Sequence, residues 1–260
     1  MTDVPTPPAG RDLLAGKVVL VTAAAGTGIG NATARRCIDE GATVVLSDAH
    51  ERRLGEAADE LTELASGVRP LTLVCDVTVE DQVQAMIDGA VAEHGRLDVV
   101  VNNAGLGGTA ELVDMTDDQW HKVLDITLTG TMRCMRSTLR HMYERGSGVI
   151  VNNASVLGWR AQAGQAHYAA AKAGVMALTR SAAIEAAPHG VRVNAVAPSL
   201  AMHAFLAKVT TDELLDELTQ REAFGRAAEP WEIATVIAFL ASDYSTYMTG
   251  EVVSVSSQRA

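Results

Sequence analysis

Aromatic residues are scarce in this sequence: 4% of its 260 residues are Phe, Trp or Tyr, although 48% are hydrophobic. A core without many large rings must be filled by alanine and aliphatic side chains, which suits helices packed closely on a sheet. The length and the hydrophobic content exclude a disordered chain and predict one folded domain.

Positive charge is also in short supply. The chain has 21 Lys and Arg against 32 Asp and Glu, a formal charge of −11 at pH 7, so its surface should on average repel nucleic acid and anionic membranes. No apolar run approaches the length that spans a bilayer, and the N-terminus, MTDVPTPPAGRDLL, lacks an apolar signal core. We therefore expect a cytoplasmic protein without nucleic-acid or membrane partners, with residues 1–14 forming a flexible arm.

Cysteine is rare as well. Cys37, Cys75 and Cys134 are odd in number and form no CxxC motif. Reduced, packed thiols are the expected state, consistent with the cytoplasm, and no metal site is predicted.

Apolar runs rich in β-branched residues recur between longer helical patterns. Strands are expected at 17–22, 43–47, 71–75, 97–103, 148–153, 191–196 and 251–255, and helices at 28–40, 51–65, 79–94, 117–142, 165–187 and 230–241. Runs without polar alternation predict strands buried on both faces. The repeated order predicts an α/β, single-domain Rossmann fold with a doubly wound, seven-stranded parallel sheet and helices on both faces. The domain would cover residues 15–260 and include a short helical substrate flap at 199–229.

A glycine-rich stretch, TAAAGTGIG at 22–30, ends the first predicted strand and opens the first helix. Gly26, Gly28 and Gly30 would allow a tight turn and a close approach of the backbone to a pyrophosphate, which the free N–H groups of the helix start would bind. An ordinary strand–helix turn is the alternative, so the stretch by itself is weak evidence.

A carboxylate supports the dinucleotide interpretation. Asp48 closes the second strand, twenty residues after Gly28, where such folds place an acid that binds the adenosine ribose. This carboxylate would repel a 2′-phosphate, so NAD is expected rather than NADP. Two alternatives stay open: Asp48 merely caps the next turn, or Arg52 and Arg53 help to hold a phosphate.

Two further strand ends carry matching features. Asp76 follows the third strand, where an adenine edge would lie. The segment NNAG follows the fourth strand and would bring Asn103, Ala104 and Gly105 close to the cofactor. Each could be only a strand-end turn, but their recurrence at successive strand ends favours a cofactor site.

The segment YAAAK (168–172) lies in an alanine-rich helical pattern. A spacing of four residues puts Tyr168 and Lys172 on one helix face. A nearby ammonium should lower the pKa of the phenol, so that Tyr168 can exchange a proton with a substrate oxygen near neutral pH. Ser155, just past the fifth strand, could hold that oxygen. A surface Tyr–Lys pair and a loop serine are the alternatives for these residues taken singly.

Together these motifs resemble the short-chain dehydrogenase/reductase family over nearly the whole chain after residue 15. The matching segments are GTGIG (26–30), Asp48, Asp76-Val77, NNAG (102–105), Ser155, YAAAK (168–172), VRVNAVAP (191–198) and GRAAEPWEIA (225–234). The resemblance implies hydride transfer between NAD(H) and an alcohol or ketone, with Tyr168 as acid or base, Ser155 as partner of the substrate oxygen, and Lys172 bridging Tyr168 and the cofactor. It also implies that the cofactor contacts Thr22, Thr27, Ile29, Val77, Pro198, Tyr168 and Lys172.

The resemblance further implies a homotetramer. The helices at 117–142 and 165–187 would pack across a two-fold axis. Their small residues, such as Gly130, Ala169, Ala173 and Gly174, would permit close approach.

Some positions depart from the family pattern. Thr22 is followed by Ala23 where Gly is usual, and the glycine loop is one residue longer, which puts the contacts of residues 23–27 in doubt. Thr127 replaces the Asn that usually completes a catalytic tetrad and helps to hold a relay water. Ser199 and His203 replace a usual Gly and Thr; at His203 a flap residue and a ligand contact are equally open.

The substrate is harder to predict. Segments 106–112, 156–165 and 199–225 should wall the cleft. An apolar lining would come from Leu106, Val156, Leu157, Trp159, Leu200, Met202, Phe205 and Leu206, several of which could instead be core residues. TAAAGTGIG, NNASVLGWRAQ and GEVVSVS resemble an actinobacterial subgroup that degrades steroid rings C and D and acts on methyl-hydrindane propanoyl-CoA compounds. Arg160 or Lys208 would then meet the CoA phosphates.

Two other functions stay open. A 3-oxoacyl-thioester reductase would share the catalytic residues, but Asp48 disfavours the NADPH expected for biosynthesis. A non-catalytic NAD-binding regulatory protein would fit Thr127 and the altered loop, but not the intact set of Ser155, Tyr168 and Lys172.

Overall fold

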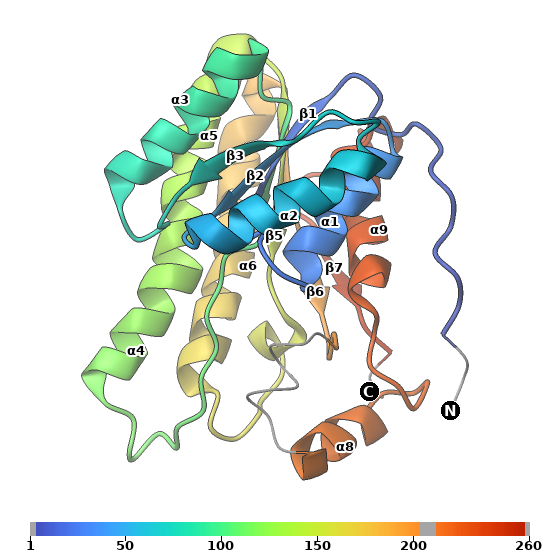
Figure 1. The fold of residues 1–260 in the computed structure, drawn as a ribbon. Coiled ribbons are helices and arrows are strands. Elements are labelled where there is room, and N and C mark those ends of the chain that lie inside the picture. Colours follow the sequence, from blue (N-terminus) through green and yellow to red (C-terminus); the bar gives the residue numbers. More distant parts are fainter. Residues whose placement is uncertain (1–3, 203–211, 258–260) are drawn as a thin grey trace.

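A parallel sheet of seven strands forms the centre of the molecule (Figure 1). The computed structural model describes residues 4–202 and 212–257. The strands lie in the order β3-β2-β1-β4-β5-β6-β7, with every neighbouring pair parallel. They are β1 (Val18–Thr22), β2 (Thr43–Asp48), β3 (Leu71–Val74), β4 (Val99–Asn102), β5 (Gly148–Asn153), β6 (Val191–Pro198) and β7 (Val252–Val255). The predicted fold class and its seven strands are confirmed.

Helices cover both faces of the sheet (Figure 1). One face carries α1 (Ile29–Asp39), α2 (Glu51–Leu64) and α9 (Pro230–Ala241), and the other carries α3 (Glu80–His94), α5 (Gly130–Arg145) and α6 (Ala166–Ala186). In β1, Val19 and Val21 enter the first core while Val18 and Leu20 enter the second, because successive strand side chains point to opposite faces. This burial on both sides explains why the strand sequences lack polar alternation.

The strand order reverses beside β1, which has β2 on one side and β4 on the other. At such a switch point the loops leaving neighbouring strands run to opposite faces and open a crevice at the carboxyl edge. The glycine loop leaves β1 at this edge, and the segments after β4 and β5 leave it there too. The sequence motifs are therefore gathered at one end of the sheet.

The helix predicted at 117–142 is not continuous. Helix α4 (Asp117–Leu124) passes through one wide π-helical turn, η1 (Asp125–Thr129), before α5 begins. Such turns often occur at functional sites. Here the turn buries Thr127 completely.

The N-terminal arm is attached to the domain for part of its length. The Glu40 carboxylate accepts hydrogen bonds from the backbone N–H groups of Arg11 (2.7 Å) and Leu13 (3.1 Å). Arg36 donates to the carbonyl of Pro8 and pairs with Glu40. These bonds join Pro8, Arg11 and Leu13, within the segment 1–14 predicted as a flexible arm, to the end of α1.

The predicted flap contains helix α8 (Asp212–Gln220) in its described part, while residues 203–211 lie outside the described residues. The two ends of the flap meet. Met202 N–H donates to the Ala228 carbonyl (3.0 Å), and Ala228 N–H donates to that of Leu200 (2.8 Å). The remaining short helical turns are η2 (Val156–Gly158), η3 (Ala187–His189) and η4 (Asp243–Ser245).

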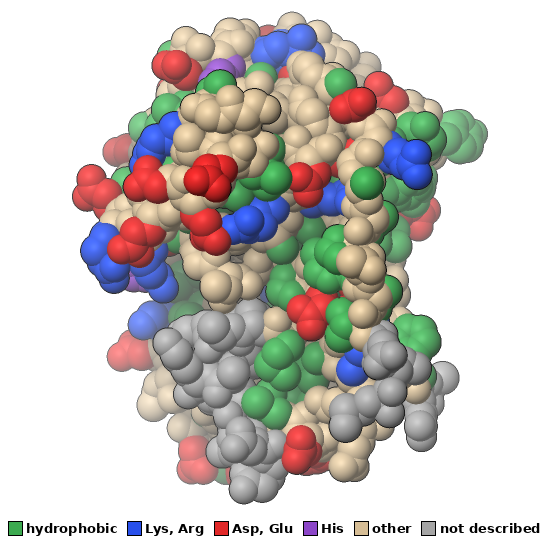
Figure 2. Space-filling model, turned by 45° about the vertical axis from the view of Figure 1, so that its right-hand side comes forward, with side chains coloured by type: hydrophobic (Ala, Val, Ile, Leu, Met, Phe, Trp, Pro, Cys, Tyr) green, Lys and Arg blue, Asp and Glu red, His purple; other side chains and the backbone are tan. Residues whose placement is uncertain are grey.

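Acidic and basic side chains are interspersed over the upper part of the face shown in Figure 2. Hydrophobic side chains gather in its lower half, beside the atoms drawn in grey. Within residues 4–202 and 212–257, no helix has the combination of length and hydrophobicity that crossing a membrane requires.

Candidate active site

The glycine loop between β1 and α1 uses glycine for two different reasons. Gly26 has a φ of +102°, a conformation that side chains disfavour. A Cβ on Gly30 would lie 2.2 Å from the Ala23 carbonyl oxygen, so only glycine lets α1 start so close to β1. Gly28 precedes α1 in the N-cap position, and no side chain caps the helix there, which leaves the first N–H groups of the helix for an anion. Thr27 is exposed and Ile29 half-buried in this loop. The loop therefore fits a cofactor diphosphate.

The ends of β1 and β4 are tied together through Thr22. Its buried hydroxyl accepts hydrogen bonds from the backbone N–H groups of Asn103 (2.9 Å) and Ala104 (3.1 Å) and donates to Val101 O (3.3 Å). Thr22 thus joins the end of β1 to Asn103 and Ala104, which follow β4, at the carboxyl edge of the sheet. Gly105 follows, and a Cβ there would lie 3.4 Å from Lys172 Nζ.

Asp48 lies at the carboxyl end of β2 and contacts the glycine loop. Its Oδ2 accepts a hydrogen bond from Ala25 N–H (3.2 Å), and its Oδ1 accepts one from His50 N–H (3.0 Å). Burial raises the pKa of this carboxyl, while the bond from Ala25 and the charge of Arg53 act in the opposite direction. Asp48 Oδ1 therefore caps the turn after β2, as the alternative interpretation expected. Asp48 Oδ2 bonds to the glycine loop that fits the cofactor.

Asp76 and Val77 follow β3. Asp76 Oδ1 accepts hydrogen bonds from the N–H (2.9 Å) and the hydroxyl (2.7 Å) of Thr78, so one carboxylate oxygen stabilises the strand-end turn. Val77 is buried against Gly130, where a Cβ would lie 2.7 Å from Val77 Cγ2. The second oxygen of Asp76 has no hydrogen bond within the described part of the chain.

The structure brings Ser155, Tyr168 and Lys172 together. Ser155 follows β5, and its side chain lies close enough to the phenol of Tyr168 to influence the pKa of that group. Lys172, one turn along α6, has its Nζ 5.6 Å from the centre of the Tyr168 ring. The same Nζ donates to the carbonyl of Asn153 (2.5 Å). The predicted spacing therefore produces a compact Ser–Tyr–Lys cluster at the carboxyl edge.

The titration of this cluster differs from the sequence expectation. Burial raises the pKa of Tyr168, and the nearby Ser155 side chain only partly opposes this. Burial also lowers the pKa of Lys172 to about 8. The expected lowering of the phenol pKa by Lys172 is therefore wrong for the protein alone, because desolvation outweighs the other influences at both groups. The phenol is held in its protonated form at neutral pH.

Thr127, which stands where the family usually has Asn, bonds to the chain that follows NNAG. Its hydroxyl accepts from Leu106 N–H (3.0 Å) and donates to Leu106 O (3.1 Å). Its own carbonyl accepts a bond from the Thr131 hydroxyl (2.8 Å). Thr127 thus fixes the segment beside Gly105 and Lys172.

Pro198 ends β6, and Ser199 N–H donates to the Val255 carbonyl (3.2 Å). Among the predicted lining residues, Val156 belongs to the core (2% exposed) while Trp159 is exposed at 51%. Those at half-burial are Leu106, Leu157, Leu200 and Met202. The predictions for His203, Phe205, Leu206 and Lys208 lie outside the described residues.

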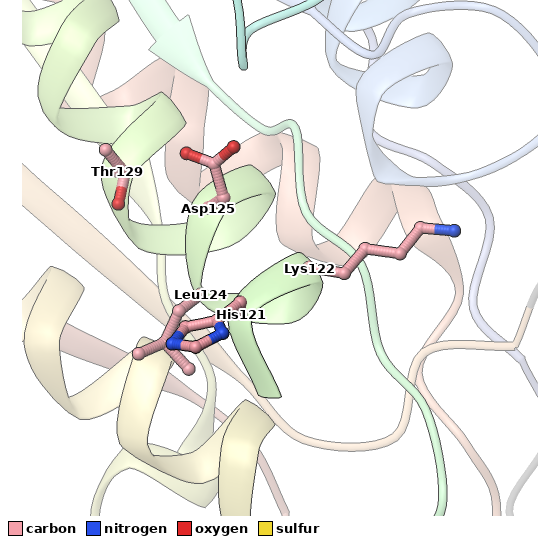
Figure 3. A pocket seen from close by; sticks show the side chains of 5 residues that line it. All are labelled: His121, Lys122, Leu124, Asp125 and Thr129. Carbon is pink, nitrogen blue, oxygen red and sulfur yellow. The ribbon is translucent and has the colours of Figure 1, made fainter. Parts of the chain in front are cut away.

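A separate hollow lies on the surface of α4 and η1. Figure 3 shows its lining side chains: His121, Lys122, Leu124, Asp125 and Thr129. None of them belongs to the Ser–Tyr–Lys cluster or to the glycine loop. Within the described ranges, no group of three or more His, Cys, Asp or Glu side chains could hold a metal ion.

Sequence reasoning missed Asn153, whose carbonyl holds Lys172 and whose side chain donates to Asn103 Oδ1 (2.9 Å). A signal was available: the strands before these residues end alike, in VVVNNA (99–104) and VIVNNA (149–154).

The comparisons agree with this geometry. The family model described as enoyl-(acyl carrier protein) reductase matches residues 23–257. The chain belongs to the short-chain dehydrogenase/reductase family and is an oxidoreductase that acts on a hydroxyl or ketone with a nicotinamide cofactor.

Its relatives narrow the chemistry. It is 66% identical to the (5R,7aS)-5-hydroxy-7a-methyl-1-oxo-2,3,5,6,7,7a-hexahydro-1H-indene-carboxyl-CoA reductase of Mycobacterium tuberculosis, over 96% of this chain and 95% of that protein. It is 44% identical to cis-4-hydroxycyclohexanecarboxylate dehydrogenase of Sinomonas cyclohexanicum, over 94% and 96%. A crystal structure of a short chain dehydrogenase from Mycobacterium smegmatis superposes with a TM-score of 0.88 at 60% identity, covering 99% of each chain.

Proposed function

We propose that this protein is an NAD-dependent oxidoreductase that interconverts a ring hydroxyl and a ring ketone on a steroid-derived CoA thioester. The type of reaction is inferred from the Ser155–Tyr168–Lys172 cluster, together with a loop that fits a dinucleotide. The class of substrate is inferred from the 66% identity to a reductase named for a hydroxy-methyl-oxo-indene-carboxyl-CoA compound.

Proton transfer would take place at the Tyr168 hydroxyl. The Ser155 hydroxyl, which lies near that phenol, would bind the same substrate oxygen and hold it in place. Because burial keeps Tyr168 protonated, the phenol suits the acid role, in which it gives its proton to the oxygen of a ketone being reduced. In the oxidative direction the phenolate must form first, so alcohol oxidation should gain from higher pH.

The remaining predicted residues would hold the cofactor. The glycine loop and the start of α1 would bind the diphosphate, Asp48 the adenosine ribose, and Asp76 and Val77 the adenine edge. Lys172, one helical turn after Tyr168 on α6, would bind the nicotinamide ribose. The nicotinamide ring of the bound cofactor accepts or supplies the hydride.

The substrate class follows from what two relatives have in common. The names of both describe a hydroxyl on a carbocycle that also bears a carboxyl group, free in one protein and a CoA thioester in the other. A ring alcohol near an acyl group is therefore the common chemistry. The compound named for the relative carries a carboxyl-CoA group, where the sequence resemblance suggested propanoyl-CoA. Arg160 is exposed and follows Trp159 in the sequence. It is the one of the two expected cations that lies within the described residues, and it is proposed to bind the CoA phosphates.

A substrate panel tests the proposal. The protein is incubated with NAD⁺ or NADP⁺ and with the indene-carboxyl-CoA alcohol, cis-4-hydroxycyclohexanecarboxylate or a simple 3-hydroxyacyl-CoA, and reduced cofactor is followed by absorbance. The proposal requires the highest kcat/KM for the ring alcohol linked to CoA. A preference for 3-hydroxyacyl-CoA with NADP⁺ would instead support a 3-oxoacyl-thioester reductase. Cofactor binding without turnover of any compound would support a regulatory NAD-binding protein.

Three further parts of the proposal concern the whole chain. Residues 15–260 would act as one catalytic domain with the flap at 199–229 over the substrate. The chain would assemble as a homotetramer. It would work in the cytoplasm, in keeping with its acidic composition and reduced thiols.

A further inference from the structure

The two central strands of the site end with the same residues. Strand β4 runs into VVVNNA and β5 into VIVNNA, and the parallel register pairs Val101 with Val151 and Asn102 with Asn152. Two successive asparagine pairs therefore lie across the gap between these strands, at the carboxyl edge of the sheet.

The first pair belongs to the core. Asn102 Nδ2 donates to Asn152 Oδ1 (2.8 Å), and Asn152 Nδ2 donates to Thr179 Oγ1 (2.9 Å). Asn102 is 2% exposed and Asn152 is fully buried. This pair links β4, β5 and α6 below the site.

The second pair reaches the glycine loop. Asn103 Nδ2 donates to the carbonyls of Thr22 and Ala23 (3.2 Å each), which fixes the orientation of its amide. Its Oδ1 is then left to accept from Asn153 Nδ2 (2.9 Å). Asn153 Oδ1, in consequence, is a buried acceptor with no partner in the described part of the chain.

The backbone of Asn153 holds the other half of the site. Its carbonyl accepts the hydrogen bond from Lys172 Nζ at 2.5 Å. One residue thus contacts the catalytic cluster through its backbone and, through its side chain, the Asn103 amide that bonds to Thr22 and Ala23. The loop end that it supports is strained, since Ala23 has a φ of +51° and Gly30 passes close to both Ala23 O and Asn103 Nδ2.

We propose that Asn153 is a positioning residue that fixes the glycine loop relative to Lys172, through the bridge Asn153–Asn103–Ala23. The proposal rests on the proposed function, because it assigns the glycine loop to the cofactor. The bridge holds the loop in the shape that receives the diphosphate, so its loss should weaken the binding of cofactor before any chemistry occurs.

The test measures the dissociation constant of NADH by the quenching of protein fluorescence, in a protein that need not turn over. Asn153→Ala should raise this constant by about five- to tenfold, as expected for one lost positioning hydrogen bond. Asn194→Ala is the matched control: Asn194 is fully buried on β6 and bonds to Met248 O (2.8 Å) and Glu251 N (3.0 Å), away from the loop. The control should lose thermal stability and keep the NADH constant of the wild type.

A double substitution tests the route. If Asn153 acts on the loop through Asn103, then adding Asn153→Ala to Asn103→Ala should change the NADH constant by less than about twofold. Multiplying effects would overturn the bridge, and an Asn153→Ala variant that binds NADH like the wild type would overturn the positioning role. If Asn153→Ala does not fold, Asn153→Asp replaces it in the test. This variant keeps the shape of the side chain but lacks the Nδ2 donor to Asn103, so it should raise the NADH dissociation constant in the same way. A wild-type protein that binds neither NADH nor NADPH would refute the proposed function itself, and with it this role.

Discussion

Tyr168 is the residue on which the proposed chemistry depends. Its hydroxyl lies near the Ser155 side chain, and burial raises the pKa of the phenol and so keeps it protonated. Tyr168→Phe removes only that hydroxyl, so turnover should fall by about a hundredfold or more, while the NADH dissociation constant stays close to that of the wild type. Steady-state rates and fluorescence titration measure the two quantities. Substantial residual turnover would mean that another group moves the proton.

Lys172 gives a pH prediction whose sign follows from its burial. Its pKa is lowered to about 8 from an unfolded value of 10.5, so between these values the unfolded chain binds the extra proton and the folded chain does not. The burial penalty is therefore complete below pH 8 and is relieved as the pH rises toward 10.5.

Lys172→Met has no such proton. The stability of this variant relative to wild type should be greatest below pH 8 and should fall by about 3 kcal/mol between pH 8 and 10.5. Urea denaturation at a series of pH values measures the difference. A difference that stays constant over this range would show that Lys172 is not desolvated in the folded protein.

Asp48 should decide the choice between cofactors. Its carboxylate contacts the glycine loop through Ala25, and a 2′-phosphate bound there would face it at a cost of about one to a few kcal/mol. NAD⁺ should therefore be preferred by at least about tenfold in kcat/KM, and Asp48→Ser should narrow the preference. Arg53 lies close enough to Asp48 to influence its pKa. Equal use of both cofactors by the wild type would show that Arg53 compensates for the carboxylate.

At the scale of the elements, the attachment of the N-terminal arm depends on one carboxylate. Glu40 is fully buried at the end of α1 and joins Arg36 to the backbone of Arg11 and Leu13. Glu40→Gln leaves the guanidinium of Arg36 without its charge partner, which typically costs about 3 kcal/mol when such a pair is buried. Chemical denaturation should show this loss.

The control for Glu40 lies on the surface. Glu60 pairs with Arg35 but is 64% exposed, so Glu60→Gln should cost less than about 1 kcal/mol. Equal losses of unfolding free energy in Glu40→Gln and Glu60→Gln would mean that the Arg36–Glu40 pair is not buried beneath the arm in solution. Neither substitution should change cofactor binding, because both lie away from the glycine loop.

The whole molecule is proposed to be a tetramer, and two of the small residues assigned to its interface also have close neighbours within one subunit. Gly130 and Gly174 were predicted to let two subunits approach. Inside one subunit, a Cβ on Gly130 would lie 2.7 Å from Val77 Cγ2 and one on Gly174 would lie 2.8 Å from Leu128 Cδ2. Both glycines serve packing within the chain. The outer surface of α6 also exposes Ile184 at 78%, a feature that suits burial against another subunit.

Light scattering at micromolar concentration measures the assembly. We expect the mass of four chains, and Ile184→Glu should shift it toward smaller species because the substitution would bury a charge in the interface. A wild-type monomer would contradict the prediction, and a tetramer unaffected by Ile184→Glu would place the contact elsewhere.

The fold could be predicted from the sequence, and so could the residues that meet at the candidate site. Unbroken runs of β-branched residues, such as VVLVT at 18–22, can be buried only as two-sided strands, and their alternation with helices leaves one topology. The spacing of Tyr168 and Lys172 needed only the helix period. The glycine loop could be predicted because Gly26 permits a positive φ and Gly30 permits the close approach of α1 to Ala23.

How these groups titrate, and which residues support them, depends on contacts between distant parts of the chain. The pKa of Tyr168 depends on how much water the fold removes from the phenol, which no spacing along the chain expresses. The bridge from Asn153 to Ala23 joins residues 130 positions apart in sequence, since the parallel register sets the ends of β4 and β5 side by side. The arm at Glu40 and the wide turn at Thr127 likewise arise from contacts between distant segments, whose energies local sequence does not determine.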